Sequence, residues 1–376
     1  MALERPDARV RSSGLATLVF SIAALLWTID FACGGIPLGF GELPSEGESG
    51  LIVPAVPTPA LESADPADAS VGEATDLGQG ATAPGPMTWV LAIAALAVLA
   101  FVIRTKRWRL ASDSGPRPMW SPAAGLGIFL LLLLAGIVGA TLALAGTEDR
   151  SEIEIDARSI LGIVVGQGIV IVWASLVSGR VSDSEGDIPS LDGTLGKRSR
   201  SPIGGAIGFG TVAMLLAYPV LATLGQVGLA LEAAWRGGEI DPIAHGTLQL
   251  LVDGGGALAS PWAVMIVLLV VTGIPICEEF AYRGLLQRAF TGWFDSGGEA
   301  NSSKARWAAI ALASVVFALM HLSALPENSR TSSLVLLFAV SLVLGWSYER
   351  TGRLAAPIAG HAVFNAINLG VATASP

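Results

Sequence analysis

Long runs of apolar residues dominate the sequence, and shorter polar stretches separate them. A helix needs about 20 residues to cross the ~30 Å hydrocarbon core of a bilayer, and most of the runs are close to that length with almost no charged residue. The pattern therefore predicts an all-α protein, a polytopic transmembrane helix bundle with about 8–9 membrane-spanning helices. The predicted spans are Gly14–Phe31, Met87–Ile103, Pro122–Ala145, Ile160–Gly179, Ile203–Leu231, Pro261–Tyr282, Trp307–His321, Leu334–Tyr348 and Ala355–Val371.

The composition supports this interpretation. Of the 376 residues, 52% are apolar and only 14% are charged, and the mean hydropathy is +0.63. Soluble domains carry about 25% charged residues, so a large soluble enzyme is disfavoured. No basic patch with interleaved aromatic residues is present, so we expect no nucleic-acid partner. Two cysteines, Cys33 and Cys277, are too few for a disulfide framework or a four-thiolate zinc site.

The polar stretches divide the chain into four parts. Residues 1–33 hold the first predicted span. Residues 34–86 are rich in Pro, Ala, Glu, Asp and Gly and contain no Lys or Arg, which predicts a disordered extracytoplasmic loop. Residues 87–200 are expected to form accessory transmembrane helices, and residues 201–376 a second helix bundle.

Basic residues gather in alternate loops, whereas the loops between them are poor in Lys and Arg. Cytoplasmic loops of membrane proteins carry an excess of basic residues. The pattern therefore predicts a multi-pass protein of the cell membrane with a cytoplasmic N-terminus. The basic residues are Arg104, Lys106, Arg107, Arg109 and Arg117 in one loop, Arg180, Lys197, Arg198 and Arg200 in the next, then Arg288, Lys304 and Arg306, and finally Arg350 and Arg353. The stretch Glu148–Asp156 on the other side is acidic.

Three short polar patterns lie on three of the last four predicted spans. They are EEFAYR at residues 278–283, FALMH at 317–321 and HAVFN at 361–365. Ionisable residues are costly within hydrocarbon and usually serve a function there. Each pattern also has a structural interpretation: a solvated interfacial turn, an interfacial histidine and a helix–helix hydrogen bond, respectively. Their occurrence in order on three spans favours a functional site. His245 lies in a predicted extracytoplasmic loop, and we assign it no role.

Helical spacing separates the two adjacent glutamates. Glu279 and Arg283 lie on one helix face at i, i+4 and can pair. Glu278 is rotated by about 100° and faces elsewhere, so its carboxylate is free to act as a general base in a cavity. His361 and Asn365 also share a face, so their hydrogen-bond donors can point at one place, as an oxyanion site requires.

The order Glu-Glu-x-x-x-Arg, Phe-x-x-x-His and His-x-x-x-Asn on successive spans resembles the CAAX-protease and bacteriocin-processing (CPBP) family of intramembrane endopeptidases. The family includes the eukaryotic CAAX endopeptidase and bacterial members linked to bacteriocin processing or self-immunity. The similarity covers about Ala259 to Val371. It implies that residues 201–376 form a catalytic bundle that hydrolyses peptide bonds of membrane-associated proteins or peptides within the lipid bilayer.

The resemblance also implies roles for the polar residues. Glu278 with His321 would activate a water, His361 and Asn365 would stabilise the tetrahedral oxyanion, and Glu279 and Arg283 would form a supporting ion pair. No acyl-enzyme is expected. No cofactor is favoured, although Glu278, His321 and His361 could hold a zinc ion. An amide side chain is a poor zinc ligand, so Asn365 beside His361 favours the metal-independent reaction.

Two further functions compete with the enzyme. One is a non-catalytic membrane binding protein, such as a self-immunity factor or scaffold, which would use the same helices. The other is a secondary transporter with Glu278 as a proton site, which the absence of an internal repeat disfavours. The pattern does not indicate the substrate or the oligomeric state.

The predicted depths of the site residues raise one geometric tension. At 1.5 Å per residue, Glu278 and His361 lie about 12–15 Å from the predicted cytoplasmic residues Arg288 and Arg353. His321 lies about 22 Å from Arg306 by the same count. We therefore expect the helix that carries His321 to be tilted or to begin earlier.

Overall fold

The computed structural model describes residues 86–106, 109–110, 120–146, 150–182, 202–236, 246–256, 258–295 and 303–374. The predicted span Gly14–Phe31, Cys33, His245 and almost all of the predicted loop 34–86 lie outside these residues. The extent of the four predicted parts of the chain stays a prediction.

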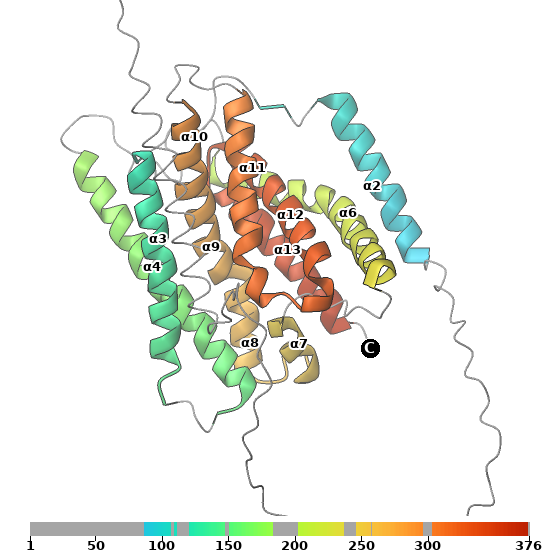
Figure 1. The fold of residues 1–376 in the computed structure, drawn as a ribbon, viewed down its shortest axis with the longest axis horizontal. Helices are drawn as coiled ribbons and strands as arrows, with labels where there is room; N and C mark the ends of the chain where they lie inside the picture. Colours follow the sequence, from blue (N-terminus) through green and yellow to red (C-terminus); the bar gives the residue numbers. More distant parts are fainter. Residues whose placement is uncertain are drawn as a thin grey trace, which may run out of the picture.

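All regular secondary structure in the described residues is helical, which confirms the all-α polytopic bundle (Figure 1). Within these residues, seven helices are long and apolar enough to cross a membrane, and Trp89–Thr105 is a shorter apolar helix. The elements in chain order are α2 (Pro86–Thr105), α3 (Pro122–Ala143), α4 (Glu152–Ser182), α6 (Ile203–Arg236), α7 (Gly246–Asp253), α8 (Pro261–Leu268), η1 (Leu269–Gly273), α9 (Ile274–Glu279), η2 (Phe280–Gln287), α10 (Arg288–Asp295), α11 (Ser303–Met320), η3 (Leu322–Ala324), η4 (Glu327–Ser329), α12 (Arg330–Thr351) and α13 (Ala355–Ala374).

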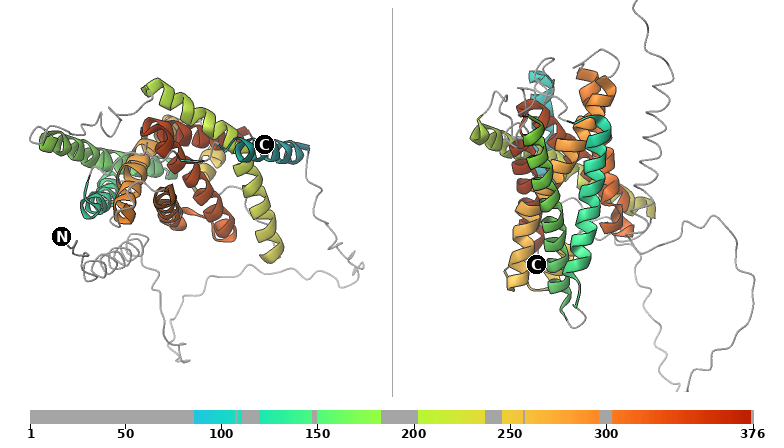
Figure 2. Two further views of the ribbon diagram at one scale, coloured as in Figure 1. Left: turned by 90° about the horizontal axis from the view of Figure 1, so that it is seen from above. Right: turned by 90° about the vertical axis from the view of Figure 1, so that its left-hand side faces the viewer.

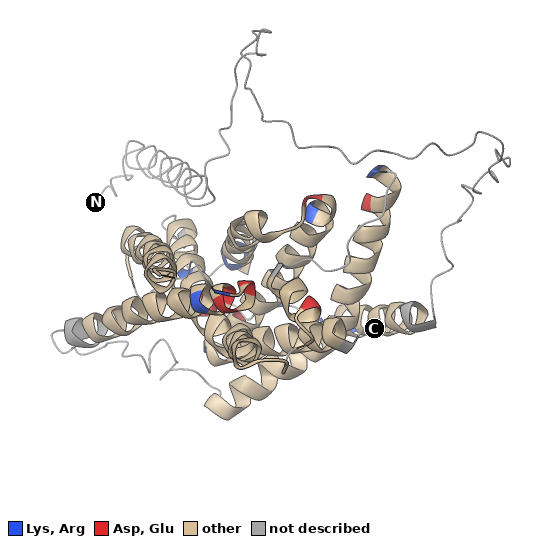
Figure 3. Cartoon of the chain, turned by 90° about the horizontal axis from the view of Figure 1, so that it is seen from below, with Lys and Arg blue, Asp and Glu red and all other residues tan. Residues whose placement is uncertain are grey.

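Charged residues are scarce along the described helices, as Figure 3 shows from below the bundle. Some charges that we interpreted as loop residues nevertheless belong to helices. α4 begins at Glu152 rather than at Ile160, because acidic residues stabilise the first turn of a helix. Within it, Glu154 accepts hydrogen bonds from Arg150 at 2.7 Å and from Arg158 at 2.9 Å.

The predicted span Pro261–Tyr282 is the beginning of a longer helix. α8, η1, α9, η2 and α10 follow one another without a break as far as Asp295. The segments η1 and η2 are π-helical and flank α9, and π-turns occur frequently at functional sites. Glu279 and Arg283, at the predicted end of the span, are buried inside the protein, whereas Glu278 is partly exposed.

Helices α3 and α4 form a close pair against one side of this long helix. A Cβ atom on Gly139 would overlap the carbonyl of Gly162, so small residues allow the two backbones to approach. α3 packs on η2 and α10, and α4 packs on α8, η1 and α9. The ring of Phe129 meets the ring of Tyr282 edge-on at 5.4 Å. The predicted accessory helices therefore support the helix that carries Glu278.

Helix α6 covers the opposite side of the bundle. It packs against α12 and α13, while α2 packs on α6 at the edge of the molecule (Figures 1 and 2). A Cβ atom on Gly210 would overlap the carbonyl of Ala356, so α6 and α13 are in backbone contact there. The α11–α12 pair completes the bundle around α13.

The helix ends beside the predicted basic loops lie at one end of the bundle. Figure 1 shows the end of α2, the start of α3, the end of α10 and the start of α11 there. At this end, Arg350 donates a hydrogen bond of 3.2 Å to the carbonyl of Arg109. The helix directions therefore alternate as the charge pattern requires. The N-terminus itself lies outside the described residues.

Two of the predicted loop arginines are inside the protein. Arg288 is buried in α10, with its guanidinium 5.4 Å from the ring centroid of Tyr348. Arg306 is buried in α11 and pairs with Glu349 at 2.7 Å. The prediction of cytoplasmic loop residues was wrong for both. It rested on their charge alone, because the sequence does not show which residues they contact. Lys304 of the same group is exposed.

A carboxylate from α6 caps α12. Glu232 is 5% exposed and accepts hydrogen bonds from the backbone N–H groups of Thr331 at 3.4 Å and Ser332 at 2.8 Å. The N-cap residue Ser329 supplies no side-chain cap. The first turn of a helix carries unpaired N–H groups and favours a negative charge. Glu232 therefore joins α6 to the connection that follows His321.

We expect Glu232→Ala to lower the free energy of unfolding by about 1–2 kcal/mol, the usual effect of losing a helix cap. Denaturation in mixed detergent–SDS micelles measures it. Glu327→Ala, at an exposed position in the same connection, serves as the matched control and should change stability by less than about 0.5 kcal/mol. Equal destabilisation by both variants would contradict the capping role.

Candidate active site

Glu278 faces two imidazole rings that come from other parts of the chain. Its Oε1 atom is 3.7 Å from Nε2 of His321, and its Oε2 atom is 3.7 Å from Nε2 of His361. Glu278 is near the end of α9, His321 directly follows α11, and His361 is in the second turn of α13. The structure thus brings together three of the residues that the sequence patterns singled out.

The second nitrogen of each imidazole has a fixed partner. Nδ1 of His321 is 2.8 Å from the carbonyl of Phe317, and Nδ1 of His361 is 2.9 Å from Oε1 of Glu279. A carbonyl and an ionised carboxylate only accept hydrogen bonds, so Nδ1 carries the proton in both rings. In a neutral ring, Nε2 then presents its lone pair toward Glu278.

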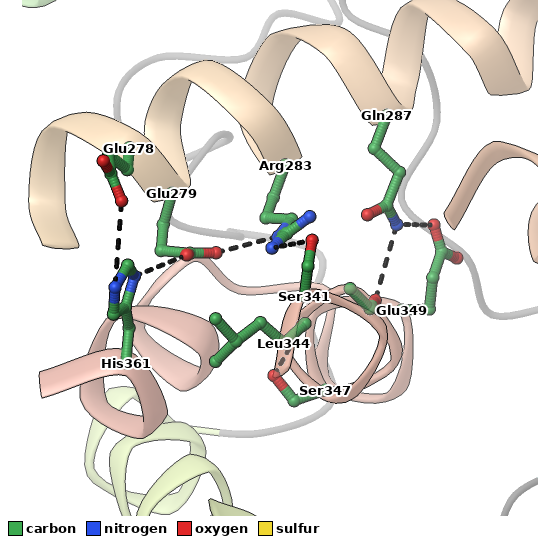
Figure 4. A network of polar contacts seen from close by, with 10 residues as sticks. Glu278, Glu279, Arg283, Gln287, Ser341, Leu344, Ser347, Glu349 and His361 are labelled. Atoms are coloured by element: carbon green, nitrogen blue, oxygen red, sulfur yellow. Dashed lines mark hydrogen bonds and ion pairs between the residues drawn. The ribbon is translucent and has the colours of Figure 1, made fainter. Parts of the chain in front are cut away.

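Glu279 is shared between His361 and Arg283 (Figure 4). Its Oε2 atom accepts a hydrogen bond of 2.9 Å from Nε of Arg283, while Oε1 takes the bond from His361. Nη2 of Arg283 in turn donates to Oγ of Ser341 on α12 at 3.0 Å. The i, i+4 spacing predicted the ion pair. It gave no sign of His361 or Ser341, because both are distant in the sequence.

Accessibility separates the two glutamates. The side chains of Glu278 and His321 are 21% and 20% exposed, whereas those of Glu279 and Arg283 are completely buried. The side chain of His361 is intermediate at 7%. Glu278 and His321 can therefore meet a water or a substrate, and the buried pair behind them positions His361.

Phe317 packs between the charged groups. Its ring centroid is 4.6 Å from that of His321 and 6.1 Å from that of His361, and the guanidinium of Arg283 lies 5.6 Å from it. The edge of Tyr282 meets the same ring at 5.0 Å. The phenylalanine of the second pattern thus holds both imidazoles by packing, and its backbone carbonyl orients His321.

A second buried polar network lies two turns along the long helix. Gln287 donates to Glu349 of α12 at 2.9 Å, and Arg306 of α11 donates to the same carboxylate at 2.7 Å. Gln287 also approaches the carbonyl of Gly345 at 3.4 Å. Figure 4 shows both networks along one face of the helix. This network was not predicted from the sequence, although the i, i+4 series Ser341, Gly345 and Glu349 was a signal for it.

One amide N–H of Asn365 is bound to the backbone of the long helix. Its Nδ2 atom donates to the carbonyl of Val270, in η1, at 2.8 Å. We had expected the donors of His361 and Asn365 to point at one place. The amide nitrogen has a second N–H, which this bond leaves available.

Glu278 and His321 lie at similar depths when residues are counted from the helix ends. The predicted difference arose because the count began at Arg288 and Arg306, which are buried. Glu278 is 17 residues before the end of α10 (278 to 295), and His321 is 18 residues after the start of α11 (303 to 321). At 1.5 Å per residue, both are about 25–27 Å from that end of the bundle. The helix of His321 does begin earlier than predicted, at Ser303.

The possible zinc ligands do not form a metal site as placed. Throughout the part of the chain that the structure describes, no group of three or more His, Cys, Asp or Glu side chains could hold a metal ion.

The fold and the site define a polytopic membrane protein with a partly accessible glutamate–histidine centre. Residues 260–367, from the start of the long helix into α13, match a family model described as type II CAAX prenyl endopeptidase Rce1-like. The match is consistent with the CPBP family and confirms the predicted resemblance. It supports intramembrane endopeptidase activity in general. Neither a curated protein nor a solved structure matches the chain.

We expect Arg283→Met to lower the free energy of unfolding by about 3 kcal/mol or more, because it leaves the buried Glu279 carboxylate without its cationic partner. Arg236→Met is the control: Arg236 also pairs with a buried glutamate at i, i+4, but it is itself 39% exposed, and Glu232 keeps two backbone N–H donors when the arginine is lost. Its effect should stay below about 1 kcal/mol. SDS denaturation of both variants measures the difference, and similar losses would contradict the structural importance of the Glu279–Arg283 pair.

Proposed function

We propose that the protein is an intramembrane endopeptidase in which Glu278 and His321 activate water for attack on a peptide bond. One observation supports this most strongly: a single accessible carboxylate faces the Nε2 atoms of two histidines, each 3.7 Å away. Direct hydrogen bonds are shorter than this, so a water molecule can lie in front of the groups and contact them. Catalytic contacts are often long before substrate binds.

The carboxylate of Glu278 is the general base in this proposal. The water donates one hydrogen to Glu278 and the other to the free Nε2 lone pair of His321. As its oxygen bonds to the carbonyl carbon, Glu278 takes the proton. Glu278 then gives this proton to the departing amine nitrogen when the C–N bond breaks. The products are a carboxylic acid and an amine, and no acyl-enzyme forms.

The developing oxyanion is stabilised by His361, with the remaining amide N–H of Asn365 as a second donor. Because Nδ1–H of His361 is already bound to Glu279, an Nε2–H donor requires the imidazolium form. The carboxylates of Glu278 and Glu279 balance its charge. Donors fixed in place before the reaction stabilise an oxyanion at low reorganisation cost.

The substrates are proposed to be membrane-associated proteins or peptides. The accessible groups Glu278 and His321 are carried by apolar helices, so a scissile bond must reach them from the bilayer or its surface. The alternating basic loops support a cytoplasmic N-terminus. A prenylated substrate is one possibility within this class and is not required by the geometry.

Glu278→Gln should lower peptide-bond cleavage by about 10²- to 10⁴-fold, because an amide cannot accept the proton from water. Purified protein is added to membranes from cells that express only the Glu278→Gln variant, and new peptide termini are counted by mass spectrometry. Glu327→Gln, at an exposed acidic position, is the control with unchanged cleavage. Undiminished cleavage by a folded Glu278→Gln protein would refute the proposed base and favour a non-catalytic role.

We also propose that the reaction needs no metal. Treatment with a zinc chelator, followed by its removal, should leave cleavage in the same terminus assay unchanged. Added zinc should not increase it. Loss of cleavage on chelation, with recovery on zinc addition alone, would contradict the metal-independent step.

A further inference from the structure

The carbonyl of Val270 lacks the usual backbone donors of a helix. In an α-helix it would accept from residue 274, and in a π-helix from residue 275. The N–H of Ile274 bonds instead to the carbonyl of Leu269, as the π-helical geometry of η1 requires. Residue 275 is proline, which has no N–H. Pro275, three residues before Glu278, therefore leaves the carbonyl of Val270 without a helical partner.

The side chain of Asn365 supplies the missing donor. Its Nδ2 atom donates to the Val270 carbonyl at 2.8 Å from the neighbouring helix α13. An unpaired carbonyl away from water destabilises the fold, so this bond compensates for the proline. Membrane helices tolerate proline where a neighbouring helix satisfies the freed backbone group.

We propose that Asn365 is a positioning residue that sets the register of α13 against the helix of Glu278. α13 contacts the helix of Glu278 through two polar bonds, from His361 to Glu279 and from Asn365 to Val270. The two donor residues are one turn apart on α13. Two such bonds prevent α13 from sliding or rotating, and they keep Nε2 of His361 opposite Glu278. The link to catalysis rests on the proposed function, whereas the link to stability does not.

The sequence itself offers a second-site test. Pro275→Ala restores an N–H that can bond to the Val270 carbonyl, and so it removes the need for the amide of Asn365. Asn368→Ala is the matched control, because the amide of Asn368 bonds to the carbonyl of Phe364 within its own helix. Pro275→Ala should therefore change the melting temperature of Asn368→Ala no more than it changes that of the wild type.

We expect Asn365→Ala to lower the melting temperature in detergent by about 3–10 °C. Adding Pro275→Ala to this variant should recover at least half of the loss, while Pro275→Ala alone should change the melting temperature by less than about 3 °C. An additive or larger loss in the double variant would overturn the proposal. So would an equal recovery of Asn368→Ala by the same second change.

Turnover at saturating substrate in the terminus assay tests the positioning role. It should rise in the double variant relative to Asn365→Ala, without reaching the wild-type value, because the second oxyanion donor is still missing. Recovered melting temperature with unchanged turnover would limit Asn365 to stabilising the fold and would overturn its positioning role. Failure of the proposed function is distinct: it appears as cleavage that persists in Glu278→Gln, whatever the melting temperatures show.

Discussion

A carboxylate with no accessible surface, that of Glu279, determines how the helices of the candidate site meet. Burying an unpaired charge in a low-dielectric interior has a very high free-energy cost. The groups that pair with the Glu279 carboxylate therefore determine its position. Arg283 comes from the same helix and His361 from α13, and Ser341 of α12 holds the arginine. Three helices are thereby fixed around one charge. Glu278, the next residue along the chain, is held opposite the two histidines as a result.

The local part of this arrangement was predictable from sequence, and the distant part was not. Apolar runs predicted the membrane helices, and i, i+4 spacing predicted the Glu279–Arg283 pair and the separate direction of Glu278. Periodicity carries no information on which helix lies opposite, so the bond from His361 to Glu279 was missed. Charge was also misleading for Arg288 and Arg306: a buried arginine and an interfacial one look the same until Tyr348 and Glu349 are placed beside them.

Helices outside the matched family region contribute to the site without supplying a reactive group. The match begins at residue 260, yet α3 packs on η2 and α4 packs on α9, the helix that carries Glu278. α6 contacts α13 through Gly210 and caps α12 through Glu232. The family region therefore contains the polar residues, and the preceding helices provide much of the apolar surface that holds them in place.

The order of the partners along the chain has a consequence for biogenesis. The long helix enters the membrane during synthesis with Glu278, Glu279 and Arg283 already in it, while Ser341 and His361 have not yet been made. Spacing at i, i+4 lets the arginine neutralise one acid inside the nascent helix itself, which eases its transfer into lipid. The second acid has no such neighbour, and it stays uncompensated until α11 and α13 emerge. Insertion of this helix and completion of the proposed catalytic centre are thus separated in time by the translation of the last three helices.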